Sequence, residues 1–315
     1  MEALIKIILD SGRSGIDLAL YVLLPVLIVM MAVMKVVEAR GVLARTANML
    51  KPLLHLFGVP GAGAFAMLQL LFVSFAAPLA TFSIMEKDGT TRRQIAATLA
   101  MVLTMSQANV VFPMAAMGLN VTAVFISSII GGFAAAALTY YILTRSITDE
   151  NDEKVQCEQP ASSLHGSKKS TTLNLMIVGG QEAVQVIMNA IPILILAIVL
   201  VNILKGIGLI ALLQTILTPF LSVIDFPAVA VLPLITKYLA GGTAMLGVAS
   251  KLLQEGAITV AELNRMAGFL TNPCDIVGVA VLVSAGVRFG SVVRPAVVGA
   301  AAGIVIRGLL HLIWF

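Results

Sequence analysis

The stretch that decides the fold is VPGAGAFAMLQLLFVSFAAPLATFSIM, residues Val59–Met85. It carries no charged side chain, and Ala76-Ala77-Pro78 lies in its middle. Two structures suit such a segment: one tilted spanning helix kinked at Pro78, or a re-entrant hairpin with two short legs. A hairpin places irregular backbone at membrane depth, which is tolerated only where protein or a water-filled cavity satisfies its polar groups.

The second half of the chain contains a counterpart of this stretch. Phe226–Lys251 has Ala240-Gly241-Gly242-Thr243 in its middle, and a Gly-Gly break in one copy with an Ala-Pro break in the other favours the hairpin. Two similar apolar halves are typical of membrane transporters built from internal repeats. A shift of 167 positions aligns identical prolines and glycines of the two halves. Pro25, Gly41, Pro52 and Pro60 then align with Pro192, Gly208, Pro219 and Pro227.

The composition predicts an all-α polytopic membrane protein. Of the 315 residues, 59% are apolar and 11% are charged, whereas a soluble domain carries about 25% charged residues. Uncharged runs such as Leu18–Met34 are long enough to cross most of a bilayer as helices. The net charge of +4 indicates positive-inside loops and no nucleic-acid partner. The N-terminus lacks the pattern of a cleaved signal peptide, so we expect a multi-pass protein of the cell inner (plasma) membrane.

The sequence divides into two repeats and a linker. The first repeat is residues 1–145, the second is residues 173–315, and the polar linker 146–172 is expected to be flexible. Each repeat is predicted to contain a short amphipathic stretch, a spanning helix with a proline near its start, an interfacial helix, a hairpin, an interrupted helix and a last spanning helix. The short stretches are expected at Met1–Leu9 and Thr172–Val178, and the interfacial helices at Val42–Phe57 and Leu209–Val223.

Loop charges predict that the two repeats are inverted. In the first repeat, basic residues flank the hairpin on both sides and the later turn Gly118-Leu119-Asn120 is uncharged. In the second repeat, the corresponding turn carries Arg288 and Arg294, while the charges that follow the hairpin cancel. Three crossings in each repeat would produce this inversion. The alternative is a parallel repeat with four crossings in each half.

Two segments at matching places are interrupted by polar residues and proline. Gln94–Gly118 has Ser106-Gln107-Ala108-Asn109 in its middle, and Leu263–Gly286 has Thr271-Asn272-Pro273-Cys274-Asp275. A pair of interrupted segments points to the solute site of a transporter, because helix ends freed at mid-membrane can face ions and polar groups. The alternative is that these side chains only join helices. We expect solute contacts from Ser106, Gln107, Asn109, Thr271, Asn272 and Asp275.

Two charges of the second repeat lie in otherwise uncharged segments. Lys237 and Asp275 are costly at membrane depth unless each faces a partner or a wet cavity. Either they pair with each other, or Asp275 binds a coupling Na⁺ or H⁺ while Lys237 meets an anionic group of the solute. Gly241, Gly242 and Thr243 would shape the site beside Lys237.

No pattern in the sequence indicates an enzyme. The three histidines lie far apart, and no Ser-His-Asp order, P-loop or H-E-x-x-H motif occurs. We therefore expect no catalytic residue, no metal site and no cofactor other than a coupling Na⁺ or H⁺. Small residues at Gly131-Gly132 predict close helix packing, either within the chain or in a homodimer.

With these features in hand, the chain resembles the nucleoside-recognition (Gate) domain membrane proteins, which include the spore-maturation-like proteins. That family is distantly similar to the concentrative nucleoside transporters and to the membrane part of the ferrous-iron transporter. The resemblance covers about 15–145 and 180–315 and implies inverted units, hairpin tips that meet the interrupted helices near the midplane, and an oligomer. Ala76-Ala77-Pro78-Leu79 matches the first hairpin tip of the nucleoside transporters, with alanine in place of an acidic residue. The resemblance adds Ala77, Pro78 and Thr81 to the expected solute site.

The predicted function is therefore a transporter-like membrane protein that moves a small polar or anionic solute, with nucleoside-like solutes included. The rival prediction is a non-transporting scaffold or sensor that uses the same fold to bind partner proteins.

Overall fold

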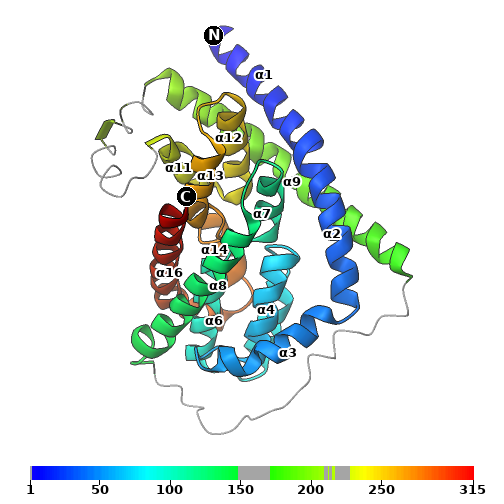
Figure 1. The fold of residues 1–315 in the computed structure, drawn as a ribbon, viewed down its shortest axis with the longest axis vertical. Coiled ribbons are helices and arrows are strands. Elements are labelled where there is room, and N and C mark those ends of the chain that lie inside the picture. Colours follow the sequence, from blue (N-terminus) through cyan, green and yellow to red (C-terminus); the bar gives the residue numbers. More distant parts are fainter. Residues whose placement is uncertain (1, 148–170, 209–211, 213–214, 217–227) are drawn as a thin grey trace.

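The computed structural model describes residues 2–147, 171–208, 212, 215–216 and 228–315, and most of this part is helical (Figure 1). The first repeat consists of α1 (Glu2–Asp17), the π-helical η1 (Leu18–Leu23), α2 (Leu24–Ala39), α3 (Val42–His55), α4 (Gly61–Phe72), α5 (Pro78–Lys87), α6 (Arg92–Thr104), α7 (Ala108–Ala115), α8 (Val121–Leu138) and η2 (Thr139–Leu143). The second consists of α9 (Thr172–Gly206), η3 (Ala228–Ala230), α11 (Val231–Ala240), α12 (Gly242–Gln254), α13 (Val260–Leu270), α14 (Ile276–Val283), α15 (Val287–Ser291) and α16 (Val293–Trp314). Most of the linker 146–172 and of the expected interfacial helix Leu209–Val223 lies outside the described residues.

Each repeat begins with one long helix, which corrects the expected short stretch followed by a separate helix. In the first repeat, α1, η1 and α2 are continuous, and the π-helical η1 ends two residues before Pro25, which has no N–H to donate. In the second repeat, α9 runs through 35 residues without a break. The two long helices pack along each other in opposite directions (Figure 1). A side-chain carbon on Gly179 would lie 2.6 Å from the carbonyl oxygen of Met31, so this crossing requires glycine.

Both expected hairpins are present. The legs α4 and α5 pack against each other across the turn 73–77, and α11 and α12 pack across a sharp turn at Gly241. Gly241 has a φ of 91°, a backbone conformation that favours glycine over other residues. The hairpin prediction is therefore confirmed, and the single helix kinked at Pro78 is wrong.

Both expected interrupted helices are also present. α6 ends at Thr104 and α7 begins at Ala108, while α13 ends at Leu270 and α14 begins at Ile276. The first part of each begins with a capping box. In it, a threonine hydroxyl accepts a hydrogen bond from the backbone N–H three residues later, and the side chain of that later residue accepts one from the backbone N–H of the threonine. These threonines are Thr91 and Thr259, so the two copies correspond in local detail as well as in outline.

Contacts between loops confirm that the repeats are inverted. The turn at the end of α7 lies at the start of α13, where the backbone N–H of Asn120 donates to Asn264 Oδ1 at 2.7 Å. The turn at the end of α14 lies at the end of the first hairpin, where the backbone N–H of Arg288 donates to Glu86 Oε1 at 2.9 Å. Each repeat therefore presents the end of its interrupted helix on the side where the other presents the base of its hairpin.

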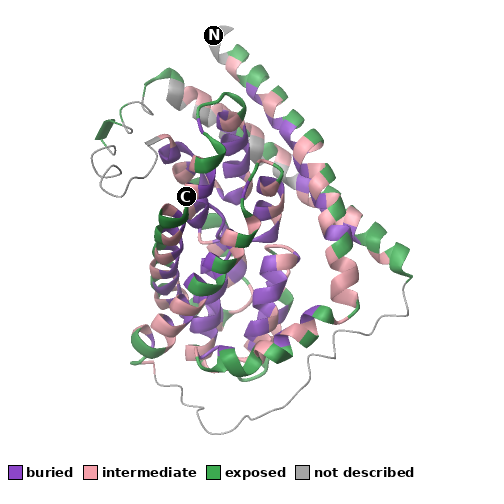
Figure 2. Ribbon diagram, viewed as in Figure 1, coloured by how far each residue is buried: buried purple, intermediate pink, exposed green. Residues whose placement is uncertain are grey.

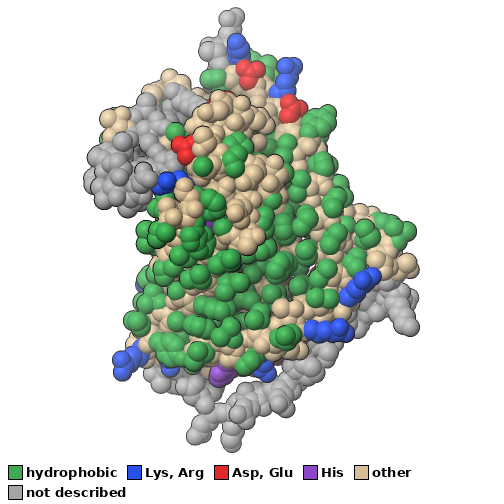
Figure 3. All heavy atoms as spheres, viewed as in Figure 1, with side chains coloured by type: hydrophobic (Ala, Val, Ile, Leu, Met, Phe, Trp, Pro, Cys, Tyr) green, Lys and Arg blue, Asp and Glu red, His purple; other side chains and the backbone are tan. Residues whose placement is uncertain are grey.

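Within the described residues, four helices are long and apolar enough to cross a membrane: Ile5–Ala39, Arg92–Ala115, Val121–Leu143 and Val293–Trp314. Three of them belong to the first repeat, an odd number as inversion requires, and one, Val293–Trp314, belongs to the second. On the face shown in Figure 3, a hydrophobic belt separates charged side chains near the two ends of the molecule. The amphipathic α3 lies across one end of the bundle, as the interfacial prediction expects (Figure 1).

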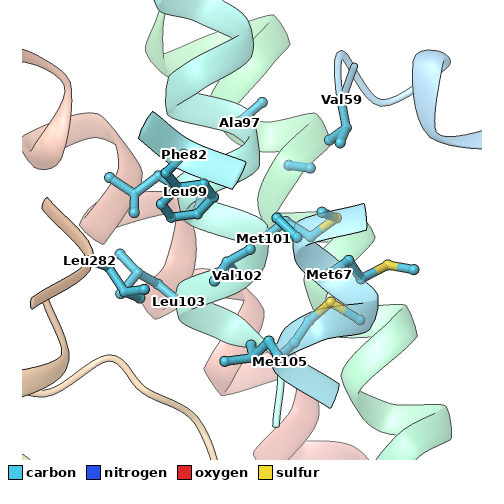
Figure 4. Packing of buried hydrophobic residues seen from close by; sticks show 14 of the residues in the cluster. Val59, Met67, Phe82, Ala97, Leu99, Met101, Val102, Leu103, Met105 and Leu282 are labelled. Carbon is cyan, nitrogen blue, oxygen red and sulfur yellow. The ribbon is translucent and has the colours of Figure 1, made fainter. Parts of the chain in front are cut away.

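The interrupted helix of the first repeat forms the centre of the fold. In Arg92–Ala115, 89% of the most apolar stretch of 18 residues is buried, against 33–44% of the corresponding stretch in the other three spans, and Figure 2 shows this contrast. Side chains of α6 pack against α4, α5 and α14 (Figure 4). The labelled members of this cluster are Val59, Met67, Phe82, Ala97, Leu99, Met101, Val102, Leu103, Met105 and Leu282. The break in this helix is buried as well, since Met105 and Ser106 are 0% exposed and Gln107 is 4% exposed.

Candidate functional site

The two helix breaks meet, and their backbones bond directly to each other. The backbone N–H of Gln107 donates to the carbonyl oxygen of Thr271 at 3.0 Å, and Gln107 Nε2 donates to the carbonyl oxygen of Asn272 at 3.2 Å. The Oγ of Ser106 lies 2.8 Å from the Oγ1 of Thr271. Polar groups that each break frees are thus satisfied by the other break, which is how irregular backbone becomes tolerable at membrane depth.

A directed chain of hydroxyl groups strengthens this crossing. Thr271 donates to the carbonyl oxygen of Ala267 at 2.9 Å, so its bond with Ser106 must use the Ser106 proton. Ser128 of α8 in turn donates to Ser106 at 2.7 Å. The guanidinium of Arg307 on α16 donates to both Ser106 Oγ, at 2.5 Å, and Thr271 Oγ1, at 2.7 Å. The last helix of the chain therefore fastens both breaks at once.

The tip of the second hairpin rests on the crossing. A side-chain carbon on Gly242 would lie 2.6 Å from Gln107 Nε2, and one on Gly241 would lie 3.6 Å from Asp275 Oδ1. The tip therefore approaches one residue of each break, and a side chain at Gly242 would have to displace the end of the Gln107 side chain. The hairpin tip that fits closely against the two breaks is thus the tip of the second repeat.

Beneath the tip, Lys237 and Asp275 form an ion pair that is almost completely buried. Lys237 comes from α11, and Asp275 is the N-cap of α14, where its Oδ1 accepts from the backbone N–H of Gly278 at 2.7 Å. The carboxylate thus faces both an ammonium group and a helix N-terminus, which together stabilise its charge. Of the two arrangements left open by the sequence, the structure has the one in which the charges pair.

The expected site residues divide into two groups. Asn272 lies at the crossing, but its side chain serves its own break, since Oδ1 accepts from the backbone N–H of Cys274 at 3.0 Å. Thr81 is bonded within the first hairpin, to Gln69 Oε1 at 2.7 Å, and Asn109 Oδ1 is buried without a hydrogen-bond partner. The residues that the structure brings together are Ser106, Gln107, Lys237, Gly241, Gly242, Thr271, Asn272 and Asp275. Within the described residues, no hydrogen bond or ion pair joins the five remaining expected residues to this group; they are Ala77, Pro78, Thr81, Asn109 and Thr243.

Sequence reasoning missed the residues of α8 and α16 that reach the crossing. Arg307 is fully buried, and one turn further along α16 the buried His311 contacts Ser127 at 3.0 Å. The available signal was a charged residue inside the apolar segment Val293–Trp314, because intramembrane charges usually have a function or a specific partner. The small residues Gly131-Gly132 pack within the chain, where a side-chain carbon on Gly131 would lie 2.7 Å from the carbonyl oxygen of Gly303.

Among the described residues, no group of three or more His, Cys, Asp or Glu side chains is placed to hold a metal ion. The site consists instead of one buried ion pair, amide and hydroxyl groups, and two opposed helix breaks beneath a glycine tip. Such a set of groups can bind a polar solute through hydrogen bonds and charge, if the tip moves away.

No family profile matches the sequence, and no curated protein matches it. Solved structures do match, among them several structures of CNTnw, a concentrative nucleoside transporter. CNTnw in an inward-facing, substrate-bound state has a TM-score of 0.69 with 17% identity, over 99% of this chain and 83% of that chain. The chain shares the fold of CNTnw. An outward-facing double variant of CNTnw gives a TM-score of 0.71 with 16% identity over the same shares, and an intermediate state gives 0.72 with 18% identity over 93% and 75%. The chain is thus a multi-pass membrane protein with the fold of CNTnw.

Proposed function

We propose that the chain is a membrane transporter of the Gate type, which binds a small polar or anionic solute between the second hairpin tip and the crossing of the interrupted helices. Nucleosides are one class of such solutes. The observation that carries the proposal is the tip, where Gly241 and Gly242 lie against Asp275 and Gln107. A small withdrawal of this hairpin would open the crossing to one side of the membrane, so the hairpin is suited to act as a gate.

The groups under the tip suit a solute that carries hydroxyl, amide or acidic groups. Gln107 Nε2 and the carbonyl oxygen of Asn272 are 3.2 Å apart, at the long end of the hydrogen-bond range, and a solute can take the place of either partner. Lys237 and Asp275 offer a donor and an acceptor side by side. A neutral solute would bind both, whereas an anionic solute would bind Lys237.

Coupling to H⁺ or Na⁺ forms part of the proposal, with Asp275 as the coupling carboxylate. A proton or Na⁺ on Asp275 would release Lys237 to the solute. Asp275→Asn keeps a side-chain oxygen for the helix cap but removes the charge. We expect this variant to abolish concentrative uptake into proteoliposomes, and uptake equal to that of the wild type would refute the coupling.

We further propose that the protein works in the inner membrane as a homodimer. The support is the resemblance to the Gate-type proteins and the wide exposure of apolar side chains on α1, α2 and α9. Cross-linking in native membranes followed by mass determination tests the stoichiometry. A cross-linked species at twice the mass of the chain is expected, and a monomer alone or a trimer would contradict a dimer.

A scaffold or sensor role is the second candidate, and one observation favours it. The polar groups at the crossing bond mainly to one another, as the Lys237–Asp275 pair and the chain from Ser128 to Thr271 do. A protein that uses the fold only to hold partners has no need of a solute site that opens.

Ligand-dependent thermal stability of the purified protein distinguishes the two candidates. A solute present at 100 times its dissociation constant adds about 2.7 kcal/mol to the native state. We therefore expect at least one compound in a panel of nucleosides, nucleotides, organic anions and cations to raise the melting temperature. Lys237→Met should abolish the shift, and Asp88→Asn, at an exposed loop position, should preserve it. A folded sample that responds to no compound would favour the scaffold.

A further inference from the structure

The side chain of Arg307 is the largest fully buried one in the described structure, and no described carboxylate pairs with it. Its Nη1 donates to the carbonyl oxygen of Thr104, and its Nη2 donates to Ser106 Oγ and Thr271 Oγ1. Its Nε has no hydrogen-bond partner. A buried cation that meets only neutral oxygens is costly unless another source of negative potential compensates it.

Two helix C-termini supply that potential. Thr104 is the last residue of α6, and Thr271 is the C-cap of α13, so both helices end at the guanidinium. Each helix C-terminus carries a partial charge of about −0.5. Two of them together offset part of the cost of burying this cation without a carboxylate.

The surrounding chain is built to admit this side chain. A side-chain carbon on Gly131 would lie 2.4 Å from Arg307 Cγ, and one on Gly268 would lie 2.5 Å from the carbonyl oxygen of Arg307. Glycines on α8 and α13 therefore provide the space for the arginine and for the close approach of α16. These two glycines come from different repeats, and the guanidinium likewise contacts residues of both repeats.

We propose that the guanidinium of Arg307 is the resident cation of the helix crossing. In transporters with interrupted helices, freed carbonyl groups and half-helix C-termini commonly coordinate a free cation such as Na⁺. Here a covalently attached cation occupies such a position and sets the spacing between the two breaks. Arg307 is thus a positioning residue, and its role does not depend on whether the protein transports a solute.

Chemical rescue tests this role. Arg307→Ala leaves the carbonyl and hydroxyl groups in place but removes the cation, so we expect its melting temperature to fall by about 5 °C or more. Guanidinium chloride in the tens of millimolar range should raise the melting temperature of this variant relative to choline chloride at equal ionic strength, and should not raise that of the wild type. His311→Ala is the matched control, because it opens a buried space on the same helix where no helix C-termini converge. Rescue of both variants, or of neither, would overturn the proposal.

Two further variants keep the proposal testable if Arg307→Ala does not fold. Arg307→Lys retains the charge without the forked donors, and Arg307→Met retains much of the volume without the charge. We expect the order of melting temperatures to be wild type, Arg307→Lys, Arg307→Met. If Arg307→Met melts at or above Arg307→Lys, volume and not charge holds the crossing, and the proposal is wrong. Because these are stability measurements, their failure is distinct from a failure of the proposed function.

Discussion

Removal of one partner of the buried Lys237–Asp275 pair should cost far more than removal of both. The two side chains are 0% and 3% exposed, so a lone charge left at this place would have almost no contact with water. Truncating one partner of such a pair costs about 3–5 kcal/mol, in proteins whose total stability is about 5–15 kcal/mol. We expect Lys237→Met to lower the free energy of unfolding by about that amount, and Asp275→Asn to do nearly the same.

The double variant Lys237→Met/Asp275→Asn leaves no buried charge at this position. Its loss of stability should therefore be smaller than the sum of the two single losses, by about 2–3 kcal/mol. Denaturant unfolding in detergent micelles, followed by the fluorescence of the single tryptophan, measures all four corners of this cycle. Strictly additive losses would refute the argument that the two charges compensate each other. The pair between Lys35 and Glu182, with side chains 28% and 41% exposed, is the control, and Lys35→Met should cost no more than about 1 kcal/mol.

Three further predictions concern glycines, helix caps and topology. Gly131→Ala should destabilise the protein by about 1–3 kcal/mol, because the new methyl group overlaps the side chain of Arg307. Gly12→Ala, where no atom lies within 4 Å of the new methyl group, should stabilise α1 by up to about 1 kcal/mol. Denaturant unfolding curves measure both changes, and equal effects would contradict the close packing at Gly131. Thr91→Ala should cost about 1 kcal/mol through loss of the capping box, and an unchanged unfolding midpoint would show that α6 does not need this cap. Asp88→Cys and Ala257→Cys should react with membrane-impermeant maleimide from opposite sides of the membrane, the first from the inside, and labelling of both from one side would exclude the inverted repeat.

Local signals in the sequence were sufficient for the architecture. Polar residues interrupt both apolar segments, with Pro273 inside the break after Leu270 and Pro113 shortly after the break that follows Thr104, so both breaks could be expected from the local sequence. Loop charges respond to the membrane and not to tertiary packing, and they gave the correct inversion. The sequence analysis predicted a separate amphipathic stretch at Met1–Leu9, but the structure has one continuous helix over Glu2–Ala39, because a glycine such as Gly12 inside a long apolar helix costs only about 1 kcal/mol.

The partners within the site could not be read from the sequence to the same degree. Ser106 and Thr271 were expected at the site, but the side chain that joins them lies 201 positions from Ser106 and 36 from Thr271. No periodicity in the sequence links residues so far apart. A charged residue at membrane depth indicates that a partner exists, but the sequence does not show which residue that partner is. Thr81 shows the opposite case, since its partner Gln69 is only 12 residues away on the other leg of the same hairpin. The sequence analysis expected the Thr81 hydroxyl to contact a solute, but that hydroxyl donates a hydrogen bond within its own hairpin.

The position of Arg307 near the C-terminus also determines when the central crossing can form during synthesis. The break between α6 and α7 is made about 200 residues before the side chain that contacts Thr104 and Ser106, and before the second break that bonds to Gln107. Until α13 and α16 are in the membrane, the polar groups of the first break need other hydrogen-bond partners, because unpaired backbone polar groups are not tolerated in lipid. Chains with such distant contacts fold slowly and through intermediates. The nascent first repeat is therefore an incomplete assembly. Its segment Arg92–Ala115, the most buried of the four spans in the folded protein, lacks its neighbours from the second repeat until those are synthesised.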